Sequence, residues 1–139
     1  MKRVLVDTGP LVAIISRDDQ YHAVCVEALE HLPGPLFSCW PVITEAAWLL
    51  RRHPAAVRQL LDSIATGFIE LLTLQSTEAA DIGRVMEKYK GIGPQLADAA
   101  LVYLAGRDGF DTIFTLDRRD FSVFRSGKNR TMRIIPQTK

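Results

Sequence analysis

Short runs of β-branched and leucine residues alternate along this chain with longer stretches of helical periodicity, and this alternation limits the fold more than any other feature. Apolar runs typical of strands lie at residues 3–6, 36–39, 68–74, 112–115 and 132–135. Helices are expected at residues 11–15, 19–31, 41–52, 54–65, 77–89 and 95–106. Strands separated by helices predict an α/β fold with a mainly parallel central sheet of four to five strands and helices on both faces.

Length and composition indicate one compact domain over residues 1–139. No run approaches the roughly 18 apolar residues that span a bilayer. Asp7 interrupts the apolar N-terminal stretch and no cleavage site follows it, which argues against a signal peptide. Cys25 and Cys39 are far apart and lack the spacing of a zinc site, which favours reduced thiols. We therefore expect a cytoplasmic protein.

The net charge gives no strong indication of a nucleic-acid partner. It is +1, whereas a dedicated non-specific binder has a basic balance or a basic stripe. The C-terminal segment alone is basic, with one acid, Asp120, and seven lysines or arginines at positions 118, 119, 125, 128, 130, 133 and 139. It could follow a phosphate backbone or form a solvated edge, and the sequence leaves both interpretations open.

Two aspartates directly follow predicted strands. Asp7 ends the first strand, and Asp117 follows the strand at 112–115, with Asp120 three residues later. Ligands of parallel α/β sheets bind beyond the carboxyl ends of the strands, so these side chains are expected to lie in a crevice. The alternative is that Asp7 and Asp117 only cap the helices that follow them.

Two further acids lie in apolar helices. Asp98 belongs to QLADAALVYLAG, a helix apolar nearly all round and therefore expected to be buried. A buried carboxylate needs a metal, a cation or hydrogen bonds, so an ion pair with an arginine is the simpler alternative. Glu45 lies about one turn inside its predicted helix, where the helix dipole alone could also favour an acid.

The combination of these acids is more specific than any one of them. Converging carboxylates repel one another and raise one another's pKa unless a multivalent cation compensates. Oxygen ligands without histidine suit Mg²⁺ or Mn²⁺. The sequence therefore predicts an acidic, metal-binding crevice.

Four ordered segments give the chain a family resemblance: VLVDTGPLVAII, VITEAAWLL, LADAALVYLA and IFTLDRRDF. With these segments the sequence resembles PIN domains, and among them most closely the VapC-type toxins of toxin–antitoxin pairs. The resemblance covers nearly the whole chain. It implies a PIN-like fold and a metal-dependent endoribonuclease that hydrolyses RNA phosphodiester bonds.

The resemblance also implies roles for individual residues. The metal-binding and catalytic acids would be Asp7, Glu45, Asp98 and Asp117. Asp120 would either bind a second metal through water or only cap the helix. Four further residues would contact the substrate or the acids: Thr8, Thr115, Arg118 and Arg119.

The resemblance implies Mg²⁺ or Mn²⁺ as cofactor, an RNA substrate, a cognate antitoxin protein and a homodimer, with no membrane partner. The competing hypothesis is a non-catalytic PIN scaffold that binds RNA or a protein; the presence of all four acids favours catalysis. A phosphatase is not supported, because Asp7 is followed by Thr, Gly and Pro rather than by a second acid. The chain also contains no P-loop, GxSxG or HExxH motif.

Overall fold

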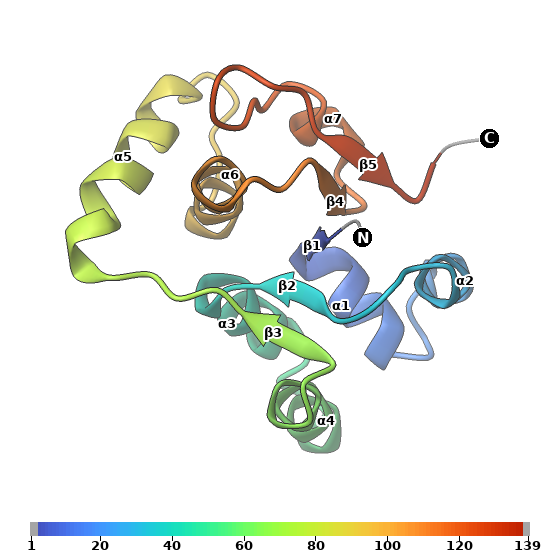
Figure 1. Cartoon of the computed structure of the whole chain (residues 1–139). Coiled ribbons are helices and arrows are strands. Elements are labelled where there is room, and N and C mark those ends of the chain that lie inside the picture. Colours follow the sequence, from blue (N-terminus) through green and yellow to red (C-terminus); the bar gives the residue numbers. More distant parts are fainter. Residues whose placement is uncertain (1–2, 138–139) are drawn as a thin grey trace.

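The computed structural model describes residues 3–137 and confirms the α/β fold. Its sheet has five strands in the order β3-β2-β1-β4-β5, and every neighbouring pair is parallel (Figure 1). The strands are β1 (Val4–Val6), β2 (Leu36–Ser38), β3 (Ile69–Leu71), β4 (Thr112–Phe114) and β5 (Arg133–Ile135). Each strand has three residues, so the sheet is short along the direction of its strands.

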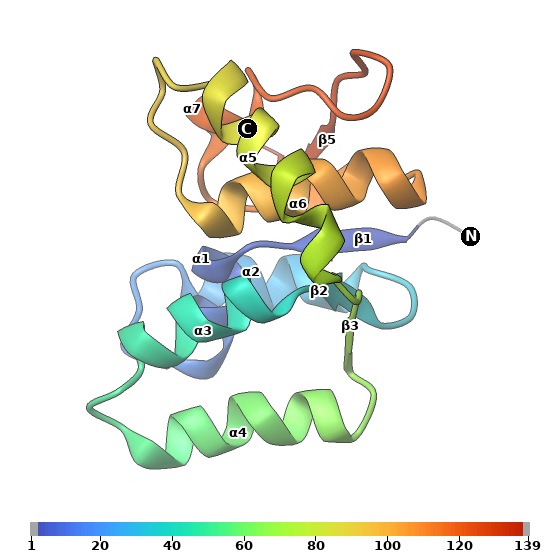
Figure 2. The same cartoon turned by 90° about the vertical axis from the view of Figure 1, so that its left-hand side faces the viewer.

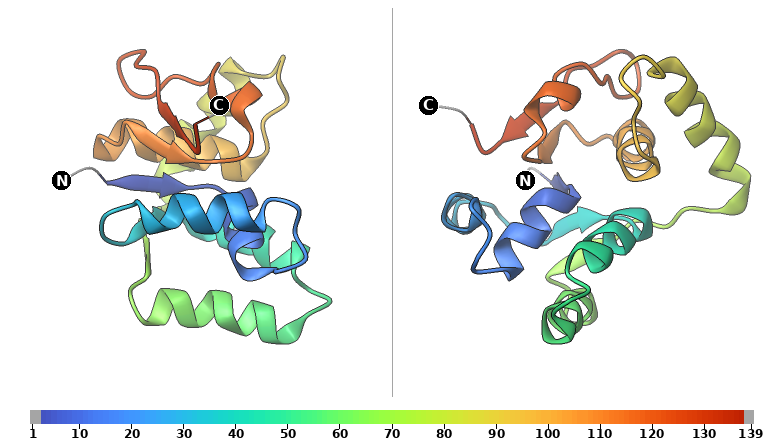
Figure 3. Two further views of the ribbon diagram at one scale, coloured as in Figure 1. Left: turned by 90° about the vertical axis from the view of Figure 1, so that its right-hand side faces the viewer. Right: turned by 180° about the vertical axis from the view of Figure 1, so that it is seen from behind.

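Helices cover both faces of the sheet. They are α1 (Thr8–Ile15), α2 (His22–Glu30), α3 (Trp40–Leu49), α4 (Pro54–Ala65), α5 (Ala79–Lys88), α6 (Leu96–Asp108) and α7 (Arg118–Phe121), with a 3₁₀ turn, η1, at Ser76–Glu78. Helices α3, α5 and α6 lie on one face (Figure 2), α1 and α2 lie on the other, and α4 lies beside the edge strand β3 (Figure 3). Among the described residues, no helix is long and apolar enough to cross a membrane.

The bounds of several predicted elements differ from the structure: α1 begins at Thr8 rather than at residue 11, and α2 begins at His22 rather than at residue 19. Three other differences lie in the middle of the chain. Helix α3 ends at Leu49 rather than Arg52, because Pro54 disfavours the helical conformation just before it. The predicted strand 68–74 shortens to Ile69–Leu71 at the edge of the sheet. The predicted helix 77–89 divides into η1 and α5, since Gln75 and Glu78 form a capping box that starts a separate turn.

The strand order places a topological switch point at the centre of the sheet. All three residues of β1, β2 and β4 are buried, as expected for strands covered on both faces. The chain passes from β1 to β2 on one side and reaches β4 on the other side only much later. Ligands of open α/β sheets bind at the carboxyl ends of such a pair. The view from behind in Figure 3 looks onto this end.

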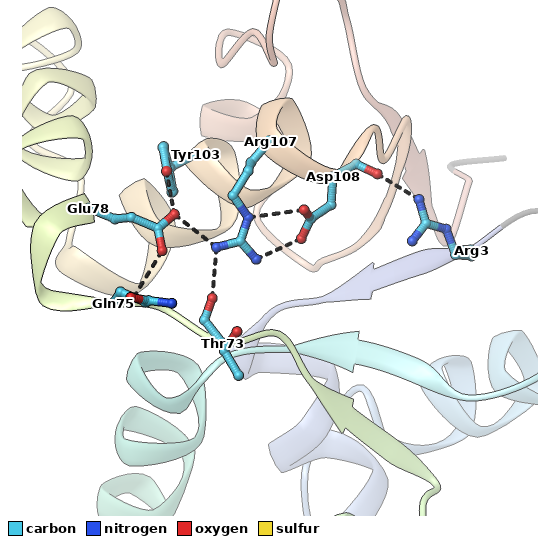
Figure 4. Close-up of polar contacts among 7 residues, drawn as sticks. All are labelled: Arg3, Thr73, Gln75, Glu78, Tyr103, Arg107 and Asp108. Carbon is cyan, nitrogen blue, oxygen red and sulfur yellow. Dashed lines mark hydrogen bonds and ion pairs between the residues drawn. The ribbon is translucent and has the colours of Figure 1, made fainter.

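A polar network fastens the C-terminal half of α6 to the chain that crosses over from β3. It joins Arg3, Thr73, Gln75, Glu78, Tyr103, Arg107 and Asp108 (Figure 4). Arg107 donates to the Thr73 carbonyl at 2.7 Å and to Glu78 Oε2 at 2.9 Å. Hydrogen bonds from Tyr103, from the Gln75 amide and from Arg107 lower the pKa of the Glu78 carboxyl to about 2. The end of α6 remote from Asp98 is therefore held by charge-assisted hydrogen bonds.

Close to this network, α6 approaches the loop before β5 at a glycine. A Cβ atom on Gly106 would lie 2.7 Å from the backbone nitrogen of Gly127 and 3.0 Å from its Cα. Gly127 is itself in the left-handed region, with φ of 46°, so a side chain there would also be strained. Contact between two backbones thus fixes the loop against the helix.

The substitution Gly106→Ala should lower stability despite alanine's better helix propensity. Overpacking against a backbone costs about 1–3 kcal/mol, which outweighs a helix gain of about 1 kcal/mol. Gly83→Ala in α5 is the matched control, because nothing lies within 4 Å of its added Cβ. It should stabilise by about 0.5–1 kcal/mol. Urea unfolding of both variants measures the difference, and equal effects would contradict the close approach.

Candidate functional site

Five acidic side chains line one cleft of about 450 Å³ at the carboxyl ends of the central strands. They are Asp7, Glu45, Asp98, Asp117 and Asp120. The remaining wall consists of Thr8, Gly9, Leu49, Gly93, Gln95 and Leu116, with no lysine or arginine from the part of the chain that the structure describes. The fold therefore brings together, from four separate segments, all five acids singled out in the sequence.

Asp7 extends β1 by one residue into the cleft. Its backbone amide donates to the Phe114 carbonyl at 2.9 Å, which continues the ladder with β4. The side chain is only 7% exposed, and its Oδ2 accepts a hydrogen bond from the Thr115 hydroxyl at 2.8 Å. Asp7 occupies the N-cap position of α1 but makes no capping hydrogen bond. Its side chain is thus held by the residue that follows β4, and it does not act as the cap of α1.

Burial and like charge act on the Asp7 carboxyl in the same direction. Loss of solvation is the main cause that raises its pKa, from 3.8 to about 7, and the charges of Asp98 and Glu45 add to it. Hydrogen bonds from the Thr8 amide and the Thr115 hydroxyl oppose the rise without cancelling it. A neighbouring positive charge would stabilise the ionised carboxylate and lower its pKa again.

Asp98 lies in the first turn of α6, inside a capping box. Its Oδ2 accepts from the Gln95 amide at 3.2 Å, while the Gln95 side chain accepts from the backbone of Asp98. Burial raises the pKa of Asp98, and the charges of Glu45, Asp117 and Asp120 raise it further. Between residues 3 and 137, no arginine or lysine forms a salt bridge with it, so the alternative of a structural ion pair is not observed.

Glu45 projects from α3 towards the start of α1. Its Oε1 accepts a hydrogen bond from the Thr8 hydroxyl at 2.6 Å. Helix α3 packs against both α1 and α6, so Glu45 lies between the segments that carry Asp7 and Asp98. Thr8 is therefore the hydroxyl partner of Glu45, in the same way as Thr115 is the partner of Asp7.

Asp117 combines the two roles that the sequence left open. It lines the cleft, and its Oδ1 accepts from the Asp120 amide at 3.1 Å, which makes it the N-cap of α7. Its own amide donates to the Thr115 hydroxyl at 3.0 Å. Burial and the charge of Asp117 raise the pKa of Asp120, whose side chain shares the cleft.

The structure does not bring Arg118 and Arg119 to the wall of the cleft. Arg118 donates to the Pro136 carbonyl at 2.6 Å and so ties α7 to the chain after β5. Arg125 likewise donates to carbonyls of its own segment, including those of Ser122 and Val123. Lys139, the last member of the basic segment, lies outside the described residues. Gln95, which sequence reasoning missed, could have been found as an N-cap three residues before an acid.

The donor set fits a hard divalent cation, although the acids do not close into a cage. Every polar side chain at the cleft offers oxygen, as Mg²⁺ and Mn²⁺ prefer. Over residues 3–137, no three acidic, histidine or cysteine side chains are close enough to form a ready-made metal site. Mg²⁺ characteristically keeps several waters and few direct carboxylates, so an open acidic cleft suits it.

Comparison with known proteins agrees with this geometry. The family pattern described as PIN domain matches residues 4–126, and the chain therefore belongs to the PIN-domain family. Ribonuclease VapC26 of Mycobacterium tuberculosis (strain ATCC 25618 / H37Rv) is 30% identical over 135 residues, which span 96% of this chain and 100% of that protein. The chain is thus a homologue of a VapC-type ribonuclease.

A solved structure shares the fold. The crystal structure of VapC20 from Mycobacterium tuberculosis, described as a Sarcin-Ricin loop cleaving toxin, superposes with a TM-score of 0.68. The match covers 79% of this chain and 86% of that chain at 14% sequence identity. It confirms the PIN-like α/β architecture.

The buried Asp7 predicts a pH-dependent stability in the presence of EDTA. Because its pKa is about 7 in the folded state and 3.8 when unperturbed, the folded protein retains a proton that the unfolded chain loses. Stability should therefore fall as the pH rises from 4 through 7. Asp7→Asn removes this loss, so the variant should exceed the wild type by on the order of 3 kcal/mol at pH 8.

Chemical unfolding of both proteins at pH 4 and pH 8 tests this expectation. The difference between them should shrink to less than about 1 kcal/mol at pH 4, where the folded wild type is protonated at Asp7 and the unfolded chain is about half protonated. Glu70→Gln, an exposed carboxylate-to-amide change on β3, is the control. If the difference in unfolding free energy is the same at both pH values, burial does not raise the pKa of the Asp7 carboxyl.

Proposed function

We propose that this chain is a metal-dependent endoribonuclease and the toxin component of a type II toxin–antitoxin system. The observation that carries the proposal is the convergence of five carboxylates, without a basic side chain, in one cleft at the switch point of a PIN-family sheet. The homology with a ribonuclease supports RNA as the substrate class.

Asp7, Glu45, Asp98 and Asp117 would hold Mg²⁺ or Mn²⁺. The Asp120 carboxylate would contact the metal through a bound water, while its backbone amide donates to Asp117 in the cap of α7. A bound divalent ion supplies an activated water and stabilises the charge that develops on the phosphoryl oxygens. The raised pKa values of Asp7 and Asp98 support the proposal, because a cation at the cleft would offset the repulsion among these carboxylates.

Neighbouring hydroxyl and amide groups orient these acids. Thr115 holds Asp7, Thr8 holds Glu45, and the Gln95 amide holds Asp98. Hydrogen bonds of this kind fix the direction of each carboxylate before a ligand arrives. The first turn of α6 also favours negative charge, since the helix dipole is positive there.

The two arginines of α7 differ in how free they are to contact the substrate. Arg119 is exposed on α7, next to Asp120, and would contact an RNA phosphate at the edge of the cleft. Arg118 would have to leave the Pro136 carbonyl to do the same. We therefore assign the phosphate contact to Arg119 and a bracing role to Arg118, with Thr8 beside the reacting group.

The proposed partners are a cognate antitoxin and a second copy of the chain. An apolar surface on α2 and α3 is the feature expected for such partners, and both helices have exposed apolar side chains, Val24 and Leu49. We place the protein in the cytoplasm, which suits the buried free thiols of Cys25 and Cys39.

The first test is cleavage of a mixed structured RNA by the wild type and by Asp98→Asn, each with Mg²⁺, Mn²⁺ or EDTA. We expect wild-type cleavage that EDTA abolishes and that the variant reduces by more than about 100-fold, because a metal ligand is lost. Glu87→Gln, an exposed acid on α5, is the matched control and should cleave like the wild type. RNA binding without cleavage, even after refolding to strip any partner, would favour the non-catalytic scaffold.

A second prediction concerns the Thr115 hydroxyl. Thr115→Val removes the donor to Asp7 and the acceptor for the Asp117 amide, and should weaken Mn²⁺ binding and cleavage by about 10–100-fold. Thr115→Ser should restore both. Thr112→Val, also a buried threonine in the β4 segment, is the control for loss of a hydroxyl. Calorimetric titration with Mn²⁺ measures the effect, and equal losses in the two valine variants would refute the orienting role.

A further inference from the structure

A second hollow of about 410 Å³ adjoins the acidic cleft. Its walls come from the N-terminal ends of α3 and α6, and it shares two residues with the cleft, Glu45 and Gln95. Helices α3 and α6 pack side by side on one face of the sheet (Figure 2). Because the two hollows share a wall, a chain bound at the acids can extend directly into this one.

Two large apolar side chains face solvent at this hollow. Trp40 is 57% exposed and Leu96 is 55% exposed, although both begin helices whose inner faces are buried. Neither belongs to the hydrophobic core. Pro41 and Ala97 complete the apolar wall, so the hollow presents an aromatic ring within an apolar setting.

The charge of the hollow selects the part of a nucleotide that it can accept. Of residues 3–137, no lysine or arginine lines it, and Glu45 is the one charged residue in its wall. A phosphate would be repelled there, whereas a neutral, planar base can stack on an indole ring. Thr44 and Gln95 add polar groups at the margin.

We propose that this hollow is a nucleobase subsite, in which the base next to the scissile phosphate stacks on Trp40 against Leu96. The proposal rests on the ribonuclease function proposed above and specifies its substrate. A base that enters the hollow has left its stack, so the RNA must be unpaired at that nucleotide. Single-stranded loops and bulges offer such bases, whereas continuous duplexes do not.

Trp48 provides a matched control on the same helix. It is 63% exposed, but it does not line the hollow, and its ring is covered by the Arg51 guanidinium at 3.9 Å. The chain has two tryptophans, so Trp48→Phe leaves Trp40 as the only indole, and Trp40→Phe leaves Trp48. Fluorescence can thus report on each ring separately.

The binding experiment uses both single-tryptophan proteins in the Asp98→Asn background, with Mg²⁺ present. A short single-stranded RNA should quench Trp40 and leave Trp48 nearly unchanged. The same RNA in a duplex should quench Trp40 far less, and so should the same RNA with an abasic nucleotide next to the scissile phosphate. Equal responses of the two rings, or equal quenching by the duplex, would overturn the subsite.

The kinetic experiment uses proteins with Asp98 intact. Trp40→Ala should lower kcat/KM for the unpaired substrate by about 10-fold or more, as expected for a lost base stack. Trp40→Phe should recover most of the activity, and Trp48→Ala should stay within about twofold of the wild type. Equal kinetics for the two alanine variants would overturn the proposal.

Three further outcomes separate this proposal from others. If light scattering shows that Trp40→Ala reduces the number of copies in the assembly, the hollow is an interface between copies and the base subsite is refuted. If the wild type cleaves no RNA while single strands still quench Trp40, the nuclease function fails and the base site stands. If the wild type cleaves and Trp40 does not respond, the nuclease stands and the subsite fails.

Discussion

One hydroxyl group, that of Thr115, joins the two central strands at the point where their ligand crevice opens. It donates to Asp7 at the end of β1 and accepts from the amide of Asp117 beyond β4. The rest of the site depends on this link, because the parallel pairing of β1 with β4 brings the acids to one level and the hydroxyl orients them. A buried carboxylate needs such a partner, since burial alone would leave it protonated or unsatisfied.

The architecture could be predicted from the sequence because the two periodicities of the chain are distinct. Apolar runs at Val4–Val6 and Thr112–Phe114 are too short and too continuous for surface helices, and both became buried strands. The ends of the helices and strands could be predicted less well. The 3₁₀ turn at Ser76–Glu78 depends on a capping box, and the early end of α3 depends on Pro54, so both are decided by one or two residues rather than by a period.

The acids of the site could be predicted because each occupies a costly position: the end of a buried strand or an apolar helix. The family resemblance named Thr8 and Thr115 as neighbours of the acids, but it could not say which acid each one meets, since nothing in the spacing of Thr8 and Glu45, or of Asp7 and Thr115, reveals the pairing. These contacts are created by the packing of α1 on α3 and of β1 on β4. The exposure of Trp40 could not be predicted either, because an aromatic residue at the start of an apolar helix resembles a core residue.

The network around Arg107 has a consequence for how much the length of the chain can vary. Helix α6 presents Asp98 at one end and is fixed through Arg107 and Asp108 at the other, to Thr73 and to Arg3. An inserted residue within a helix turns one end by about 100° relative to the other. One extra residue between these points would force either Asp98 out of the cleft or Arg107 out of its bonds. The nine steps along the chain from Asp98 to Arg107 therefore set the distance and the angle between the acidic cleft and the network that anchors α6.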